Sequence, residues 1–339
     1  MINTFRKNHF QKCATLIWLA FFSILIMLGA PLIGVSQLSW SEVFQRVSEN
    51  RDAMIFWQIR IPRVLVAFLA GATFALSGMV FQALFRNPLV SPFTLGVSAG
   101  ASFGAALSIW LGITFTFFGI TSISVFSFFG AVFSIVCVWF LAKIKKGSSI
   151  STMLLAGVAV SFFFASFIMF IQYLSDINQA AQITRWIMGG LFVFGYEQVL
   201  NILPFTMIGF GVIWFFTNEL NLFTTGEEMA QSRGVHVDGM VRILFFLISL
   251  MIGGVVAVCG PIAFVGIVAP HICRLLFGSN HLYLTPATFL FGGSFLVVCD
   301  AVSRTVLAPA EIPLGVITAL IGGPFFLWIL ITRSGEDII

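Results

Sequence analysis

The sequence predicts an all-α, polytopic membrane protein with about ten transmembrane helices. Only 9% of its 339 residues are charged, 59% are hydrophobic, and the mean hydropathy is +1.05. A soluble domain carries about 25% charged residues. The apolar stretches are continuous rather than alternating, which indicates helices and not a β-barrel. This composition excludes a water-soluble globule, a disordered chain, a coiled coil and a nucleic-acid-binding protein.

Ten apolar segments have the length needed to cross the hydrocarbon core, about 20 residues for a helix. The first follows a basic amino terminus; it is too long for the apolar part of a secretory signal, and no clean cleavage site follows it. We therefore expect it to be a span. The segments run over 13–34, 63–84, 93–112, 115–142, 150–173, 197–217, 241–259, 262–278, 284–304 and 313–332. No linker separates them, so we expect a single transmembrane domain over residues 1–339.

Basic residues set the expected orientation, because cytoplasmic loops are enriched in Lys and Arg. An even number of spans puts both termini on one side of the membrane. Placing them in the cytoplasm assigns these basic residues to the inner side: Arg6, Lys7, Lys12, Arg86, Lys143, Lys145, Lys146, Arg233, Arg242, Arg274 and Arg333. The smaller outer set contains only arginine: Arg46, Arg51, Arg60, Arg63, Arg185 and Arg304. We therefore expect a multi-pass protein with cytoplasmic termini.

Neither a metal site nor a catalytic site is expected. The five cysteines (Cys13, Cys137, Cys259, Cys273 and Cys299) occur singly, without the paired spacing of a disulfide framework or a metal site. The chain contains no G-x-x-x-x-G-K-[ST] phosphate loop and no H-E-x-x-H motif. We therefore predict no catalytic residues, no metal and no cofactor, and we expect any ATP to be bound by another subunit.

A spacing shared by the two halves of the chain suggests an internal repeat. Gly71, Gly78 and Pro88 follow the pattern G-x6-G-x9-P, and so do Gly253, Gly260 and Pro270. In the expected topology the first set lies on an inward-running span and the second on an outward-running one, as in an inverted repeat. With 31 glycines in the chain, an accidental match is the alternative.

The longest expected cytoplasmic loop, about 218–240, contains the stretch Gly226–Val235. Glu227 and Glu228 would lie in the first turn of a short helix, where acidic side chains suit the helix dipole, and Gly234 is suited to its end. Two interpretations stay open: a short helix that docks into another protein, or a solvated loop.

Arginines mark the opposite side. Arg60 and Arg63 flank Pro62 just before the second span, and Arg304 ends the ninth. They are either interfacial arginines that reach towards the headgroups or a docking surface for an acidic partner, since arginine pairs bidentately with carboxylates. Asp300 lies four residues before Arg304, on the same helical face. We expect these two residues to form a structural ion pair near the outer interface.

Several motifs together resemble the FecCD/BtuC-type permease subunits of iron-siderophore, haem and cobalamin ABC importers, which are type II ABC importers. The resemblance covers residues 16 to 333, and it is strongest in the carboxyl-terminal half. Its motifs are Gln58–Arg63, Gly71-Ala72, Ser77-Gly78, Gln82–Leu89, Leu95–Ala101, Leu155–Ala159, Trp186–Gly190, Gly260–Gly266, Pro270–Ile272, Asp300, Arg304, Pro309–Gly315 and Thr318–Phe326. Ala263 departs from the family, in which glycine is common at this position.

The resemblance implies ten helices with inverted internal symmetry and a pair of permeases, identical or paralogous, around a central path. It places the ATPase contact on Glu227, Glu228, Met229, Ala230, Ser232 and Gly234. It makes Arg60, Arg63 and Arg304 the docking residues for a periplasmic or lipid-anchored solute-binding protein, and it gives Gly71, Gly78 and Gly100 a role in helix packing. The implied location is the bacterial inner membrane.

The resulting functional prediction is a permease subunit of a binding-protein-dependent ABC importer, driven by ATP hydrolysis on a separate subunit, with a ferric siderophore as the expected cargo. Haem and cobalamin are the alternatives within the family. An ion-coupled secondary transporter is the alternative of another class, but Asp300 alone serves an ion site poorly. An intramembrane enzyme would need clustered acids or a nucleotide site.

Overall fold

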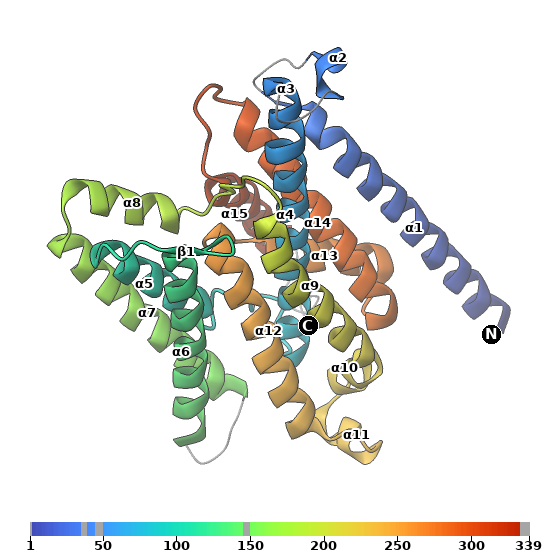
Figure 1. Ribbon diagram of the computed structural model, residues 1–339. Coiled ribbons are helices and arrows are strands. Elements are labelled where there is room, and N and C mark those ends of the chain that lie inside the picture. The colour runs from blue at the N-terminus through green and yellow to red at the C-terminus, as the bar shows by residue number, and fades with distance from the viewer. Residues whose placement is uncertain (1, 35–38, 45–49, 145–149, 333–339) are drawn as a thin grey trace.

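The computed structural model describes the whole chain except residues 1, 35–38, 45–49, 145–149 and 333–339. It is a bundle of helices with a short β-hairpin (Figure 1). The elements, in chain order, are α1 (Ile2–Gly29), the 3₁₀-helix η1 (Ala30–Leu32), α2 (Trp40–Val43), α3 (Arg51–Met54), the π-helix η2 (Ile55–Arg60), α4 (Ile61–Leu84), α5 (Val97–Trp110), β1 (Thr116–Phe117), β2 (Ile120–Thr121), α6 (Ser122–Ile144), α7 (Ile150–Leu174), α8 (Ile177–Ile187), α9 (Glu197–Phe215), α10 (Thr217–Thr224), α11 (Glu227–Ser232), α12 (Val237–Cys259), α13 (Val265–Phe277), α14 (His281–Thr305) and α15 (Leu314–Thr332).

Helix α4 forms the centre of the bundle. It continues α3 and η2 into one helical span over Arg51–Leu84, and nearly every residue of α4 is buried. A helix that is apolar on all sides can lie in a protein core or in lipid, and α4 lies in the core because it packs on α9, α12, α13 and α14. Arg60, the last residue of η2, and Arg63, in the first turn of α4, lie at one end of α4, and the other end leads into the loop 85–96.

Each of the ten predicted spans coincides with one helix, which agrees with the prediction of about ten transmembrane helices. Seven helices in the described chain are long and apolar enough to cross a membrane; α5, α13 and α15 are shorter apolar helices. Three predicted spans begin too early. For 93–112 and 262–278 the reason is that residues 85–96 and 260–264 form loops, and for 115–142 it is that residues 116–121 form the β-hairpin before α6. Gly96 and Gly260 have φ angles of 78° and 66°, which an α-helix cannot accommodate.

The two halves of the chain are packed reciprocally. In each half a long helix precedes a short one: α4 precedes α5, and α12 precedes α13. Helix α4 packs on α13 and α14 of the second half, and α12 packs on α5 and α6 of the first. Helices α4 and α12 start from opposite ends of the bundle (Figure 1). This arrangement supports an inverted repeat.

The repeat does not reside in the predicted glycine–proline pattern. Gly78 lies inside α4, whereas Gly260 caps the end of α12. Pro88 lies in a loop, whereas Pro270 lies inside α13. The matching residues therefore occupy different structural positions. The shared G-x6-G-x9-P spacing is thus an accidental match and not part of the repeat.

Glycines allow the closest helix contacts. A Cβ atom added at Gly71 would collide with the carbonyl oxygen of Gly292 in α14, and one at Gly78 with that of Gly266 in α13. Gly100 of α5 faces the backbone of Gly130 in α6 in the same way. Small residues let helix backbones approach in a membrane, so all three predicted packing glycines lie at backbone-to-backbone contacts.

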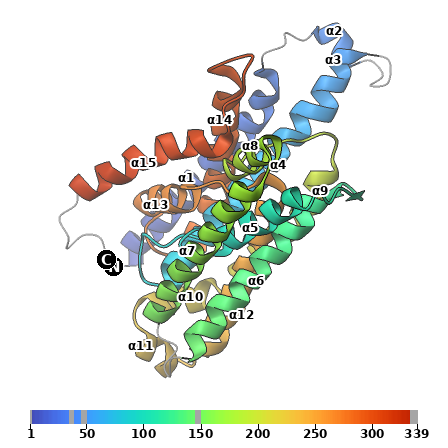
Figure 2. The same cartoon turned by 90° about the vertical axis from the view of Figure 1, so that its left-hand side faces the viewer.

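The bundle has two distinct ends. Helices α2 and α3 lie at one end and α11 at the other, a separation visible in both views (Figures 1 and 2). Helix α8 lies towards the α3 end (Figure 1). It begins with a capping box in which the Asp176 side chain accepts from the Gln179 backbone N–H. We refer to the two ends as the α3 end and the α11 end.

Candidate functional site

A buried cluster of charges occupies the α3 end. Arg63 donates from Nε to Asp300 Oδ1 at 2.9 Å and from its two Nη atoms to Glu311 at 3.1 and 2.9 Å. Arg304 Nε lies 3.0 Å from Asp300 Oδ2. The predicted ion pair between Asp300 and Arg304 is thus confirmed. Asp300 is enclosed between two arginines from α4 and α14.

The same cluster fixes the segment that follows α1. Arg60 Nη1 donates to the carbonyl oxygen of Pro31 at 3.0 Å, and Arg304 Nη1 donates to that of Ile33 at 3.0 Å. Arg60 ends η2, the π-helical turn, a type of irregularity that is frequent at functional sites. Three distant parts of the chain, namely the end of α1, the start of α4 and the end of α14, therefore meet here.

The burial of the arginines changes the expected docking surface. Arg60, Arg63 and Arg304 are only 5%, 9% and 5% exposed, so their charges already serve interactions within the chain. The sequence did not reveal this arrangement, because Arg63 is 237 residues from Asp300 and 248 from Glu311. Glu311 belongs to the motif Pro309–Gly315, which by itself assigns it no role, and its side chain is 48% exposed.

An accessible pocket nevertheless reaches Arg63. Its volume is about 280 Å³, and its lining includes Arg63, Arg185, Ser303 and Glu311. Arg185 is exposed near the end of α8. The pocket thus presents an exposed arginine, a partly accessible one and a half-exposed glutamate. An incoming carboxylate could pair with Arg185 and compete with Glu311 for Arg63.

The predicted helix at the other end is present as α11. Gly226 and Gly234, with φ angles of 142° and 85°, flank it. Glu227, Glu228, Met229 and Ser232 are exposed, and the exposed fraction of Met229 is 49%. An exposed methionine among polar residues is suited to contact with another protein.

Ala230 does not fit the predicted contact. It is fully buried, because α11 turns this side towards the bundle. Its carbonyl oxygen accepts from the N–H of Val235 at 3.1 Å. Ala230 therefore seats α11 on the bundle and cannot touch a partner with its side chain.

Sequence reasoning missed a polar connection beside α11. Asn221 of α10 accepts from the backbone N–H of His281 at 2.8 Å, and its Oδ1 lies 2.8 Å from His281 Nδ1. Its Nδ2 donates to Asn280 Oδ1 at 3.1 Å. Asn280 also caps α14, and a cap of this kind is readable from sequence. The partner 59 residues away is not. The interaction ties α10 to the start of α14.

An open apolar groove lies between α5, α7 and α15. Its volume is about 610 Å³, and small residues such as Ser98, Ser102, Ser161 and Ala319 line much of it. Helix α15 packs mainly on α13 and α14, and it extends away from the body of the bundle (Figure 2). Leu320, Leu327 and Ile331 are 65%, 61% and 84% exposed. One side of this groove is thus left without a covering element in the described chain.

Comparisons with known proteins agree with this architecture. The model of the FecCD transport family matches residues 18–332. An uncharacterised ABC transporter permease protein, YvrB of Bacillus subtilis, is 37% identical over 98% of this chain and 98% of its own. The hemin transport system permease protein HmuU of Yersinia pestis is 35% identical over 93% of this chain and 94% of its own.

A solved structure shares the fold. It is described as an inward-facing conformation of a metal-chelate type ABC transporter, with a TM-score of 0.81 and 29% identity over 94% of this chain and 100% of that one. These agreements in sequence and structure give the assignment: the chain belongs to the FecCD transport family and is a multi-pass permease of a type II ABC importer.

Proposed function

We propose that this permease, with a second permease subunit, forms the path by which a metal chelate, specifically a ferric siderophore, is imported across the bacterial inner membrane. The observation that carries the proposal is the arrangement of three surfaces. An exposed short helix lies at one end, a charged pocket at the other, and an apolar groove of small residues lies along the bundle. A hemin permease and a metal-chelate type transporter among the similar proteins favour a chelated metal as cargo.

The second permease would cover the groove and α15. Isolated, lipid-exposed helices gain by packing on a partner through small residues, and the groove offers serine and alanine for such packing. Two copies, or two paralogues, facing each other across this groove would enclose a central path. A path lined by small and apolar side chains suits a bulky chelate whose metal is already coordinated.

The ATPase subunit would contact α11. Glu227, Glu228, Met229, Ser232 and Gly234 remain in this proposal, and Ala230 is removed from it. Replacing Met229 with Glu is expected to weaken binding of the ATPase subunit and to lower uptake without changing the thermal stability of the permease. Asn178→Glu, which adds the same charge at an exposed position in the first turn of α8 at the α3 end, is the matched control for ATPase binding. Equal ATPase binding by the Met229 variant and the wild type would exclude this contact.

A solute-binding protein would dock at the α3 end, with its carboxylates at Arg185 and Arg63. Arg60 and Arg304 would act indirectly, by holding the chain after α1 in place. Arg185→Glu is then expected to reduce binding-protein affinity while leaving thermal stability unchanged, because Arg185 is exposed. The buried arginines should instead affect stability. Unchanged affinity in Arg185→Glu would contradict docking at this pocket.

Uptake into proteoliposomes tests the function itself. The permease is reconstituted with its ATPase and binding protein, and ATP-dependent uptake is compared for a ferric siderophore, haem and cobalamin. Preferred uptake of haem or cobalamin would replace the cargo and keep the importer. Uptake that continues without ATP but stops when an ion gradient is dissipated would support a secondary transporter and refute the proposal.

A further inference from the structure

Helices α6 and α9 leave a space between them over α12. Both helices pack on α12, but in the described chain they do not pack extensively on each other. Helices α1 and α14, by contrast, leave no such space. They pack directly on each other, and Ser294 donates to Ser23 at 2.8 Å across the contact. In the described chain, α6 and α9 therefore lack the direct packing that α1 and α14 have.

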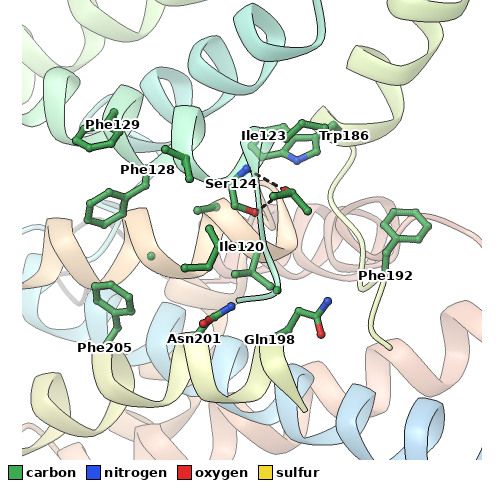
Figure 3. Close-up of a pocket in the computed structure, with 16 residues that line it drawn as sticks. Ile120, Ile123, Ser124, Phe128, Phe129, Trp186, Phe192, Gln198, Asn201 and Phe205 are labelled. Carbon is green, nitrogen blue, oxygen red and sulfur yellow. Dashed lines mark hydrogen bonds between the residues drawn. The ribbon is translucent and has the colours of Figure 1, made fainter. Parts of the chain in front are cut away.

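The space is a formed cavity of about 460 Å³ (Figure 3). Gly254, Ala257 and Val258 of α12 form its floor. Gly254 matters here because an added Cβ atom would lie 2.7 Å from the ring of Phe205. The missing side chain lets the wall formed by Phe205 approach α12.

Aromatic side chains close both ends of the cavity. At one end, the rings of Phe128 and Phe205 lie 5.9 Å apart between their centroids and bridge α6 to α9. At the other end, Trp186 and Phe192 lie with Ile120 of the hairpin (Figure 3). The lining from α6 and α9 comes from the first turns of each helix, and the lining from α12 from its last turns. The cavity therefore lies in the half of the membrane nearer the α3 end.

The cavity opens sideways between two faces that meet the membrane. On α6, Phe129 and Phe133 are 64% and 55% exposed; on α9, Leu200 and Ile208 are 64% and 62% exposed. None of these side chains lines the groove proposed for the second permease, so we expect them to face lipid. An empty apolar cavity forfeits dispersion contacts for all of the atoms that line it. The molecule available to fill this opening within the hydrocarbon layer is a lipid, whose chain is apolar and narrow.

The cavity also has a polar end. Gln198 and Asn201, from the first two turns of α9, line it together (Figure 3). The Oε1 atom of Gln198 is buried and has no hydrogen-bond partner in the described chain. A buried acceptor without a partner is costly in an apolar environment. A ligand that supplies a hydroxyl or ammonium donor here and an alkyl chain further in would satisfy both parts of the cavity.

We infer that this cavity is a phospholipid site: it holds an acyl chain of a phospholipid from the leaflet on the α3 side, and a hydroxyl or ammonium of that lipid's headgroup donates to Gln198 Oε1 beside Asn201. The chain would fill the space between Phe128, Phe205 and Ala257. The lipid thereby takes the place between α6 and α9 that direct helix packing takes between α1 and α14. The site shares no lining residue with the groove beside α15 and lies away from α11, and it meets the pocket at Arg63 only at Phe192, which lines both.

Photocrosslinking in nanodiscs tests this inference. The probe is a phosphatidylglycerol with a diazirine near the middle of one acyl chain, and labelled peptides are mapped by mass spectrometry. We expect labels concentrated on residues 119–129, 198–205 and 254–258. Ala257→Phe fills the floor of the cavity and should reduce this labelling several-fold. Val136→Phe, on the membrane-facing side of α6 outside the cavity, should leave it unchanged.

Two further variants keep the test decisive. If Ala257→Phe fails to fold, as judged by gel filtration and melting, Ala257→Leu fills less space and should give an intermediate reduction. Gln198→Leu removes the polar end and should lower the amount of label without moving it. Labels spread evenly over the membrane faces of α6 and α9, or labelling of a folded Ala257 variant equal to that of the wild type, would overturn the site. Unchanged labelling of Gln198→Leu would overturn the assignment of its polar end.

Discussion

Asp300 is the residue on which the charge cluster depends, and its neutralisation gives the sharpest prediction. In Asp300→Asn, Arg63 keeps Glu311, but Arg304 loses its only carboxylate partner in the described chain. The Asp300 side chain is 1% exposed and that of Arg304 6%. Breaking a buried ion pair by removing one partner costs about 3–5 kcal/mol, because a buried charge is left uncompensated. We expect a loss of stability of this size.

The size of this effect can be tested against a neighbour. Glu311→Gln removes the other carboxylate, but the Glu311 side chain is 48% exposed, and solvent screening reduces such a pair to about 1 kcal/mol or less. On a scale of about 2 °C per kcal/mol for large domains, Asp300→Asn should lower the melting temperature by about 6 to 10 °C. Glu311→Gln should lower it by about 2 °C at most. Thermal unfolding of the purified permease, followed by intrinsic fluorescence, measures both changes.

A double variant separates loss of charge pairing from loss of packing. Replacing both partners with apolar residues, as in Asp300→Leu with Arg304→Met, leaves no uncompensated charge and keeps the pair between Arg63 and Glu311. Apolar replacement of a buried ion pair is often neutral or stabilising. The double variant should therefore be more stable than Asp300→Asn alone. If Asp300→Asn is no less stable than Glu311→Gln, or the double variant is the least stable, the electrostatic account of the cluster is wrong.

Two further predictions concern helix packing and the α11 end. Gly78→Ala should destabilise the permease by about 1–3 kcal/mol through overpacking, because the new Cβ atom meets the backbone of Gly266. The control is Gly211→Ala, in open space on α9, which should be neutral or stabilising. Equal melting temperatures of the two variants would contradict the contact. Asn221→Ala removes the hydrogen bonds between α10 and the start of α14. We expect it to lower the amount of substrate transported per ATP hydrolysed while ATPase binding is retained; an unchanged ratio would show that this connection has no role in coupling.

The sequence predicts the helices well because each depends on its own residues. Continuous apolar runs locate the ten helices, and two glycines locate the ends of α11. Where the prediction fails, the chain is apolar without being helical. Residues 85–96 and 260–264 are mostly apolar or small, and hydropathy alone cannot separate a buried loop from a span. The left-handed backbone at Gly96 and Gly260 decides their structure.

The site was harder to predict, because its contacts join distant parts of the chain. The pair between Asp300 and Arg304 was predictable, since four residues separate them on one helix. That Arg63 completes the same cluster depends on how α4 meets α14, and no local pattern encodes this packing. From the sequence, Arg63 therefore looks like a docking residue, yet in the fold its guanidinium is largely occupied by Asp300 and Glu311.

Helices α4 and α14 offer the most direct physical link between the two ends of the permease. They pack on each other along the bundle, with Gly71 against Gly292 at their contact. At about 1.5 Å per residue, each is long enough to cross the membrane. Arg63 and Asp300 join them at the α3 end. At the other end α10 contacts both helices. The guanidinium of Arg86, just beyond α4, lies 4.7 Å from the ring centre of Phe223, and Asn221 bonds to His281 of α14.

A displacement of α10 and α11 by an ATPase subunit would therefore act on α4 and α14 at once. Since close-packed helices move as rigid bodies rather than deform, the charge cluster at the far end would have to move with them or break. Either outcome places the response to the ATPase at the pocket proposed to receive the binding protein.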